Sequence, residues 1–63
     1  MKYEVTFHMN SGKEIGHLVE GVNEADAQFT IITNLKKPFY ALEDDLVIVS
    51  SHVEYFHLTL REE

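Results

Sequence analysis

The folding of this chain begins with the stretch Lys2-Tyr-Glu-Val-Thr-Phe-His-Met-Asn-Ser-Gly-Lys-Glu-Ile-Gly-His-Leu-Val-Glu20. Apolar and polar residues alternate over 2–9, a period of two that is typical of a half-buried β-strand. A turn sequence follows at 10–12, and Gly in the left-handed region at its end is typical of a three-residue hairpin loop. The stretch therefore predicts an antiparallel hairpin with strands over 2–9 and 13–21.

The same turn predicts which residues of the two strands face each other. If Met9 lies opposite Lys13, apolar residues collect on one face of the hairpin and opposite charges meet on the other. A shift of the register by one residue would lose both advantages. The predicted pairs are Phe7 with Ile15, Val5 with His17, Tyr3 with Val19, His8 with Glu14 and Lys2 with Glu20.

Residues 23–36 predict an α-helix. Asn23 can cap its N-terminus, acidic residues occupy the first turn, and Pro38 ends it. Several β-branched residues lower its intrinsic propensity, so we expect packing against the sheet to hold it. The apolar residues that recur with helical spacing, and that we expect to face the sheet, are Ala25, Phe29, Ile32 and, at the end of the stripe, Leu35.

The last third of the chain is rich in β-type sequence. A short strand is predicted over 39–42, an almost entirely apolar strand over 46–50, and a longer alternating strand over 53–61. A polar break at 50–52 separates the last two. Because 53–61 is longer than the run before it, we expect its surplus length to pair with the first hairpin or with another chain.

Together these elements predict a single α+β domain over residues 1–63: a small antiparallel sheet with one helix on one face, in the order ββαββ plus the short strand. A chain of 63 residues buries only about 60% of its unfolded surface, so its core is thin. The chain has no Cys, and we expect a homodimer to add the stability that disulfides cannot. The predicted core residues are Val5, Phe7, Ile15, Val19, Phe29, Ile32, Ile48, Phe56 and Leu58.

Charge and hydropathy exclude several classes of partner. Eleven acidic residues against five basic ones give a formal net charge of −6, which repels nucleic acid and anionic lipid, so we expect no direct nucleic-acid binding. No apolar run approaches the roughly 18 residues of a membrane span. The sequence opens directly on the alternating pattern, without the apolar segment of a signal peptide, so we expect a cytoplasmic protein.

The residues with catalytic or metal-binding chemistry do not form a known motif. The charged run at 43–45 lacks the alternating ligands and the Gly of a calcium loop. The Ser and His at 50–52 lack the elbow of a serine hydrolase. We therefore expect no enzyme, no catalytic residue and no cofactor.

The histidines lack the spacing of a zinc site, so we expect structural or surface roles and no metal. His17 falls on the inward face of the hairpin by register. A His-based metal module or enzyme that uses His8, His17 or His57 is an alternative. The four histidines are His8, His17, His52 and His57.

Two segments carry a resemblance to known proteins. The first comprises Met1-Lys-Tyr-Glu-Val-Thr-Phe7 with Ser11-Gly-Lys13, and the second is Leu46-Val-Ile-Val-Ser-Ser-His-Val-Glu-Tyr-Phe-His-Leu58. Both segments resemble small uncharacterised proteins of Gram-positive phages and prophages. The resemblance implies a phage accessory protein of unknown function and transfers no functional residues. The element order is also similar to that of ubiquitin-like β-grasp domains, which is the alternative fold.

The leading functional hypothesis is a non-enzymatic interaction protein. It would act through pairing at a β-edge or through an exposed apolar–aromatic patch rimmed with acidic residues. The expected interface residues are Tyr40, Tyr55, His57 and Thr59. An alternative is an acidic DNA mimic that inhibits a nucleic-acid enzyme, in which carboxylates stand in a row at about 3.4 Å per strand step. These carboxylates would come from Glu4, Glu14, Glu20 and the 43–45 loop.

Overall fold

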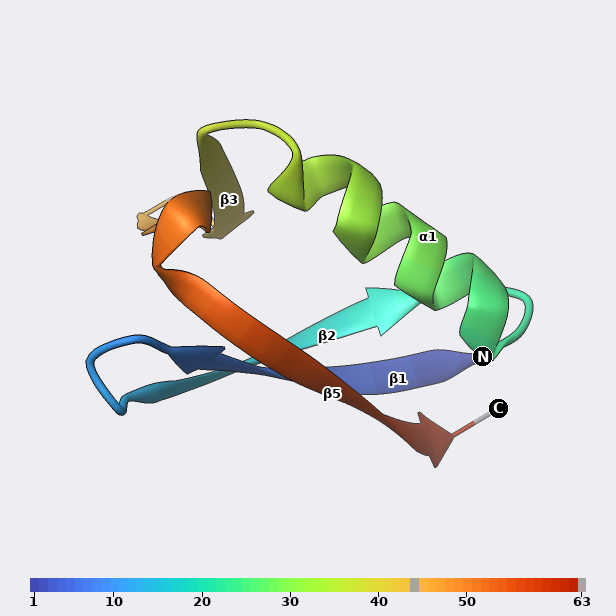
Figure 1. Ribbon diagram of the computed structural model, residues 1–63. Helices are drawn as coiled ribbons and strands as arrows, with labels where there is room; N and C mark the ends of the chain where they lie inside the picture. Colours follow the sequence, from blue (N-terminus) through green and yellow to red (C-terminus); the bar gives the residue numbers. More distant parts are fainter. Residues whose placement is uncertain (44, 63) are drawn as a thin grey trace.

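The computed structural model describes residues 1–43 and 45–62 (Figure 1). It confirms the α+β class and the predicted order of elements, and the short stretch after the helix is a further strand. The elements in chain order are β1 (Lys2–Met9), β2 (Glu14–Glu20), α1 (Glu24–Leu35), β3 (Phe39–Glu43), β4 (Leu46–Val49), the 3-10 helix η1 (Ser50–His52) and β5 (Val53–Glu62).

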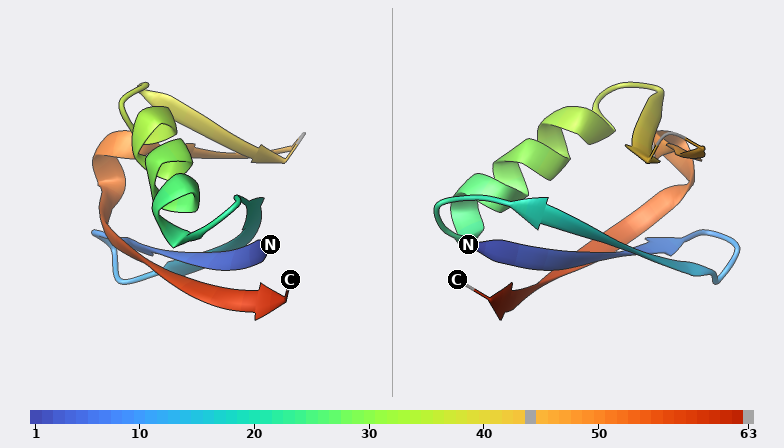
Figure 2. Two further views of the ribbon diagram at one scale, coloured as in Figure 1. Left: turned by 90° about the vertical axis from the view of Figure 1, so that its right-hand side faces the viewer. Right: turned by 180° about the vertical axis from the view of Figure 1, so that it is seen from behind.

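The strands form two antiparallel sheets instead of the single sheet that we predicted. The larger sheet has the order β2-β1-β5, and the smaller one is the β3–β4 hairpin. Both α1 and this hairpin lie on the same side of the three-stranded sheet, as the views from two sides show (Figure 2). That side is the core face, and the opposite side of the sheet is its outer face.

The predicted register of the first hairpin is confirmed in all five pairs. Gly12 has a φ of 92°, in the left-handed region that favours glycine. The N–H of Met9 donates to the carbonyl oxygen of Lys13 at 2.9 Å, and the N–H of Gly12 donates to the carbonyl oxygen of Met9 at 2.9 Å. The alternation of residues and the turn chemistry therefore determine this hairpin locally.

The pairing of β5 resolves the question of its surplus length. β5 pairs with β1 over the whole span from Met9 opposite Val53 to Lys2 opposite Glu62, while β4 pairs with β3. The three-residue η1 carries the chain from the small sheet to the large one. Within residues 1–43 and 45–62, β5 has a strand on one side only and is therefore an edge strand.

The core lies between the large sheet, the helix and the small hairpin. Phe7 is at its centre, with the ring of Tyr40 edge-on at 5.8 Å and the ring of Phe56 at 6.1 Å between centroids. The buried cluster comprises Val5, Phe7, Ile31, Tyr40, Leu42 and Ile48. Of the predicted core residues, Val5, Phe7 and Ile48 are buried, and Ile15, Val19, Phe56 and Leu58 are partly buried against them.

The capping of α1 agrees with the prediction. The side chain of Asn23 accepts a hydrogen bond from the N–H of Asp26 at 2.8 Å. Asp26 in turn accepts one from the N–H of Val22 at 3.1 Å. The N–H of Asp26 and the N–H of Val22, the residue before the N-cap, are thus each satisfied by a side chain.

The predicted sheet-facing side of α1 is wrong for Ala25, Phe29 and Ile32, whereas Leu35 is partly buried against the core as predicted. Ala27 and Ile31 are fully buried, whereas Phe29 and Ile32 are 68% and 46% exposed. A Cβ added at Gly21 would lie 2.9 Å from the backbone N of Ala27, so the connection and the helix approach closely. This contact leaves no room for a side chain at residue 21. The β3–β4 hairpin then supplies the larger core side chains.

Candidate interaction surfaces

Three aromatic side chains gather on the outer face of the large sheet. The register of β1 and β5 places His8 opposite Tyr55 and Thr6 opposite His57. The rings of His8 and Tyr55 are stacked, with centroids 4.3 Å apart and an interplanar angle of 7°. His57 is edge-on to both rings, at 5.4 Å and 5.5 Å. We call His8, Tyr55 and His57 the aromatic cluster.

Charged residues of both signs surround the aromatic cluster. Nδ1 of His8 lies 3.6 Å from Oε2 of Glu14, and Nε of Arg61 lies 3.5 Å from Oε1 of Glu4. An exposed ion pair such as that of Glu4 and Arg61 contributes at most about 1 kcal/mol. The rim of the cluster is therefore mixed in charge, whereas the sequence predicted an acidic rim.

Three of the four predicted interface residues lie together. Tyr55 is 49% exposed, and His57 and Thr59 are exposed on the same outer face of β5. His8 joins them, and sequence reasoning missed it because its contact with Tyr55 requires the non-local pairing of β1 with β5. The only local signal was its position on the outward face of the first strand.

The expectation that Tyr40 is a surface residue is wrong. Its side chain is 9% exposed and its ring contacts Phe7 in the core. The β3–β4 hairpin covers the core, and alternate side chains of a strand point to the same face. Tyr40 and Leu42 therefore both point toward the large sheet and are buried. Burial raises the pKa of the Tyr40 hydroxyl above its usual value of 10.0.

The histidines are divided between two faces of the molecule. His8 and His57 are on the outer face, whereas His17 lies opposite Val5 on the core face and is partly buried. His52 is in η1, directly before the start of β5. Among the side chains that the structure describes, no three His, Asp or Glu are placed to hold one metal ion.

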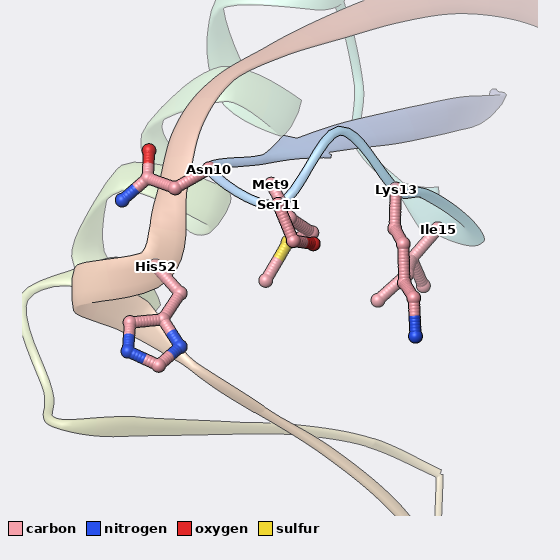
Figure 3. Close-up of a pocket in the computed structure, with 6 residues that line it drawn as sticks. All are labelled: Met9, Asn10, Ser11, Lys13, Ile15 and His52. Atoms are coloured by element: carbon pink, nitrogen blue, oxygen red, sulfur yellow. The ribbon is translucent and has the colours of Figure 1, made fainter.

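A shallow hollow of about 490 Å³ lies beside the first hairpin turn (Figure 3). The N–H of Asn10 donates to the carbonyl oxygen of His52 at 2.8 Å, which joins the turn to η1. In Figure 3 the side chains of Lys13 and His52 stand at opposite sides of the hollow. Its described lining has no carboxylate and consists of Met9, Asn10, Ser11, Lys13, Ile15 and His52.

The carboxylates that a DNA mimic would use do not form a run of like charge on the described surface. Glu4 is paired with Arg61 and Glu14 with His8. Glu20 lies opposite Lys2 in the register of β1 and β2. Residue 44 of the acidic loop lies outside the described residues. Glu4 and Glu20 thus each lie beside a basic residue, and Glu14 lies beside the imidazole of His8.

Two apolar patches outside the large sheet were not predicted. One is the outward side of α1, where Phe29 is 68% exposed. The other is the outer side of the β3–β4 hairpin, where Phe39 is 62% and Val47 is 51% exposed.

Comparison with protein-family models finds no match, and comparisons with curated proteins and with solved structures find none either. Within the described part of the chain, no helix has the length and apolar character needed to cross a membrane.

Proposed function

We propose that this chain is a non-enzymatic interaction protein that binds a protein partner along the free edge of β5. The observation that supports this most strongly is the combination of a ten-residue edge strand with an exposed aromatic cluster beside it. The unpaired backbone groups of an edge strand are a template for a further strand. A partner strand added there would gain main-chain hydrogen bonds.

Side chains on both faces of β5 would add specificity to such pairing. Successive residues of an added strand point alternately to the two faces of the sheet. On the outer face they would meet Tyr55, His57 and Thr59. On the core face they would meet Leu60, which is 51% exposed, and the partly buried Leu58. Aromatic residues are enriched where binding energy concentrates in interfaces, which favours Tyr55 as the main contact.

The proposal includes a phage or prophage origin and a cytoplasmic location. The support for the origin is the resemblance of the N-terminal and C-terminal segments to small phage proteins. The acidic net charge of −6 makes a protein a better partner than nucleic acid.

Partner capture with surface variants tests the proposed interface. The double variant Tyr55→Ala/His57→Ala removes two rings from the β5 side of the outer face. Leu18→Ala is the matched control, because Leu18 is 58% exposed on β2, at the opposite edge of the same sheet. In a lysate of the organism that encodes the chain, we expect proteins held by the wild type and by Leu18→Ala to be lost from the double variant.

A second variant tests edge pairing separately from the rings. Thr59→Lys places a charge beside the edge. Lysine is a residue with which natural sheets block the addition of a further strand at an edge. We expect it to weaken capture while the far-ultraviolet circular dichroism stays unchanged. If the double variant and Thr59→Lys both retain every protein that the wild type captures, the β5 edge is not the binding site.

A further inference from the structure

The outward side of α1 carries a continuous apolar stripe that the fold leaves uncovered. Ala25, Phe29 and Ile32 recur at i, i+4 and i+7 and therefore lie along one side of the helix. Phe29 is 68% and Ile32 is 46% exposed. The buried Ala27 and Ile31 are on the other side of the helix, against the sheet. We call Ala25, Phe29 and Ile32 the outer stripe.

The charges at the two ends of the outer stripe are opposite in sign. Glu24 and Asp26 are acidic residues of the first turn. Lys36 follows the last turn, keeps helical dihedral angles with a φ of −73° and a ψ of −18°, and is exposed. It is four residues beyond Ile32 and therefore continues the outer stripe. The stripe thus runs from an acidic end through an apolar centre to a basic end.

Such a surface is complementary to itself under a two-fold rotation. In an antiparallel pair of α1 helices centred between residues 30 and 31, Phe29 of each copy meets Ile32 of the other. Lys36 of each copy lies over Ala25 of the other, beside the acidic first turn. Residues 25 and 36 are each about 8 Å from the centre along the axis, at 1.5 Å per residue. A parallel pair would instead bring acidic ends together and basic ends together.

We propose that a second copy of this chain covers the outer stripe, as an antiparallel helix pair with two-fold symmetry. Both copies would use the same patch, which is the usual arrangement in a homodimer. Figure 1 shows α1 on one side of the large sheet, and the register places the aromatic cluster on the opposite, outer face. A contact made by the far side of α1 would therefore leave both β5 edges open. The dimer would therefore present two partner-binding edges. The inference that the dimer forms does not depend on the proposed function.

The contact is small, because one short helix from each copy forms it. Interfaces below about 1,200 Å² in total area are generally weak. We therefore expect a reversible dimer, visible by sedimentation equilibrium between about 10 µM and about 1 mM. The wild type should shift with concentration from the monomer mass of 7.3 kDa toward twice that value.

A matched pair of Phe variants locates the contact. Phe29→Asp places a carboxylate at the centre of the outer stripe and should leave only monomer over the whole concentration range. Phe39→Asp is the control, because Phe39 is 62% exposed on the outer side of the β3–β4 hairpin. It should dimerise like the wild type. Circular dichroism checks that both variants fold.

Charge complementation tests the antiparallel orientation. Lys36→Glu opposes the acidic end of the other copy, and Ala25→Lys opposes Lys36 of the other copy, so each variant alone should dimerise about tenfold more weakly. Mixed together, the two variants restore an attraction at both ends, and the mixture should dimerise like the wild type. A wild type that stays monomeric at about 1 mM, a Phe39→Asp variant that loses the dimer, or a mixture no better than its components would overturn the proposal.

Discussion

At the scale of single residues, Gly21 lets the connection after β2 lie against the first turn of α1. Its N–H donates to the carbonyl oxygen of Met1 at 3.1 Å, which fixes the connection at the end of the large sheet. The backbone of Ala27 is so close that a Cβ at Gly21 would be 2.9 Å from its N atom. The absence of one side chain therefore lets the connection and the start of the helix approach this closely.

Substitution of this glycine tests the close approach. We expect Gly21→Ala to lower the free energy of unfolding by about 1–3 kcal/mol, because backbone atoms must move to admit the methyl group. Gly16→Ala is the control: its Cβ would meet only the flexible carboxylate of Glu4, at 3.4 Å. Urea denaturation should show a change below about 1 kcal/mol for Gly16→Ala. Equal effects of the two substitutions would contradict this account.

At the scale of elements, the β3–β4 hairpin completes the core that the helix leaves open. Its inward residues Tyr40, Leu42 and Ile48 are all buried, while Phe39 and Val47 on its other side are exposed. The hydroxyl of Tyr40 must stay neutral in this position, because burial disfavours the charged phenolate and raises its pKa. The docking of the hairpin is therefore linked to the protonation of one tyrosine.

Alkaline titration tests this linkage. A raised pKa in the folded state contributes stability that is fully present below the unfolded pKa of about 10 and is lost as pH rises through the folded value. We expect the free energy of unfolding to fall above about pH 10 in the wild type and to fall less steeply in Tyr40→Phe. Tyr55→Phe, at an exposed tyrosine, is the control and should follow the wild type. An identical alkaline loss in all three proteins would show that Tyr40 is not responsible.

The elements also show what the sequence could predict. The first hairpin was predictable down to its register because alternation and turn chemistry act between neighbouring residues. The helix was predictable in extent, but its rotation depends on a hairpin that follows it in the chain. The pairing of β5 with β1, and hence the contact between His8 and Tyr55, is non-local. Tyr40 was misplaced because nothing in 39–42 indicates that this strand folds back over the core.

At the scale of the whole molecule, the fold separates two surfaces that would serve different contacts. The large sheet lies on one side of the molecule and α1 on the other (Figure 2), and the exposed outer stripe is on the side of α1 opposite its buried residues. Self-association through the helix would therefore leave the β5 edge accessible. A partner that carries two linked binding strands would engage both β5 edges, and the second contact would form at the raised effective concentration that the linkage provides.

The central claim is that β5 is an open edge at which a partner strand adds. Residue-by-residue amide hydrogen exchange, measured by NMR in the free protein and after addition of the captured partner, tests it most directly. In an antiparallel edge strand, alternate N–H groups point away from the sheet. We expect these amides of β5 to exchange faster than those of the central β1 in the free protein and to become protected on binding, while β2 is unchanged. Protection of β2 or α1 with no change in β5 would contradict the claim.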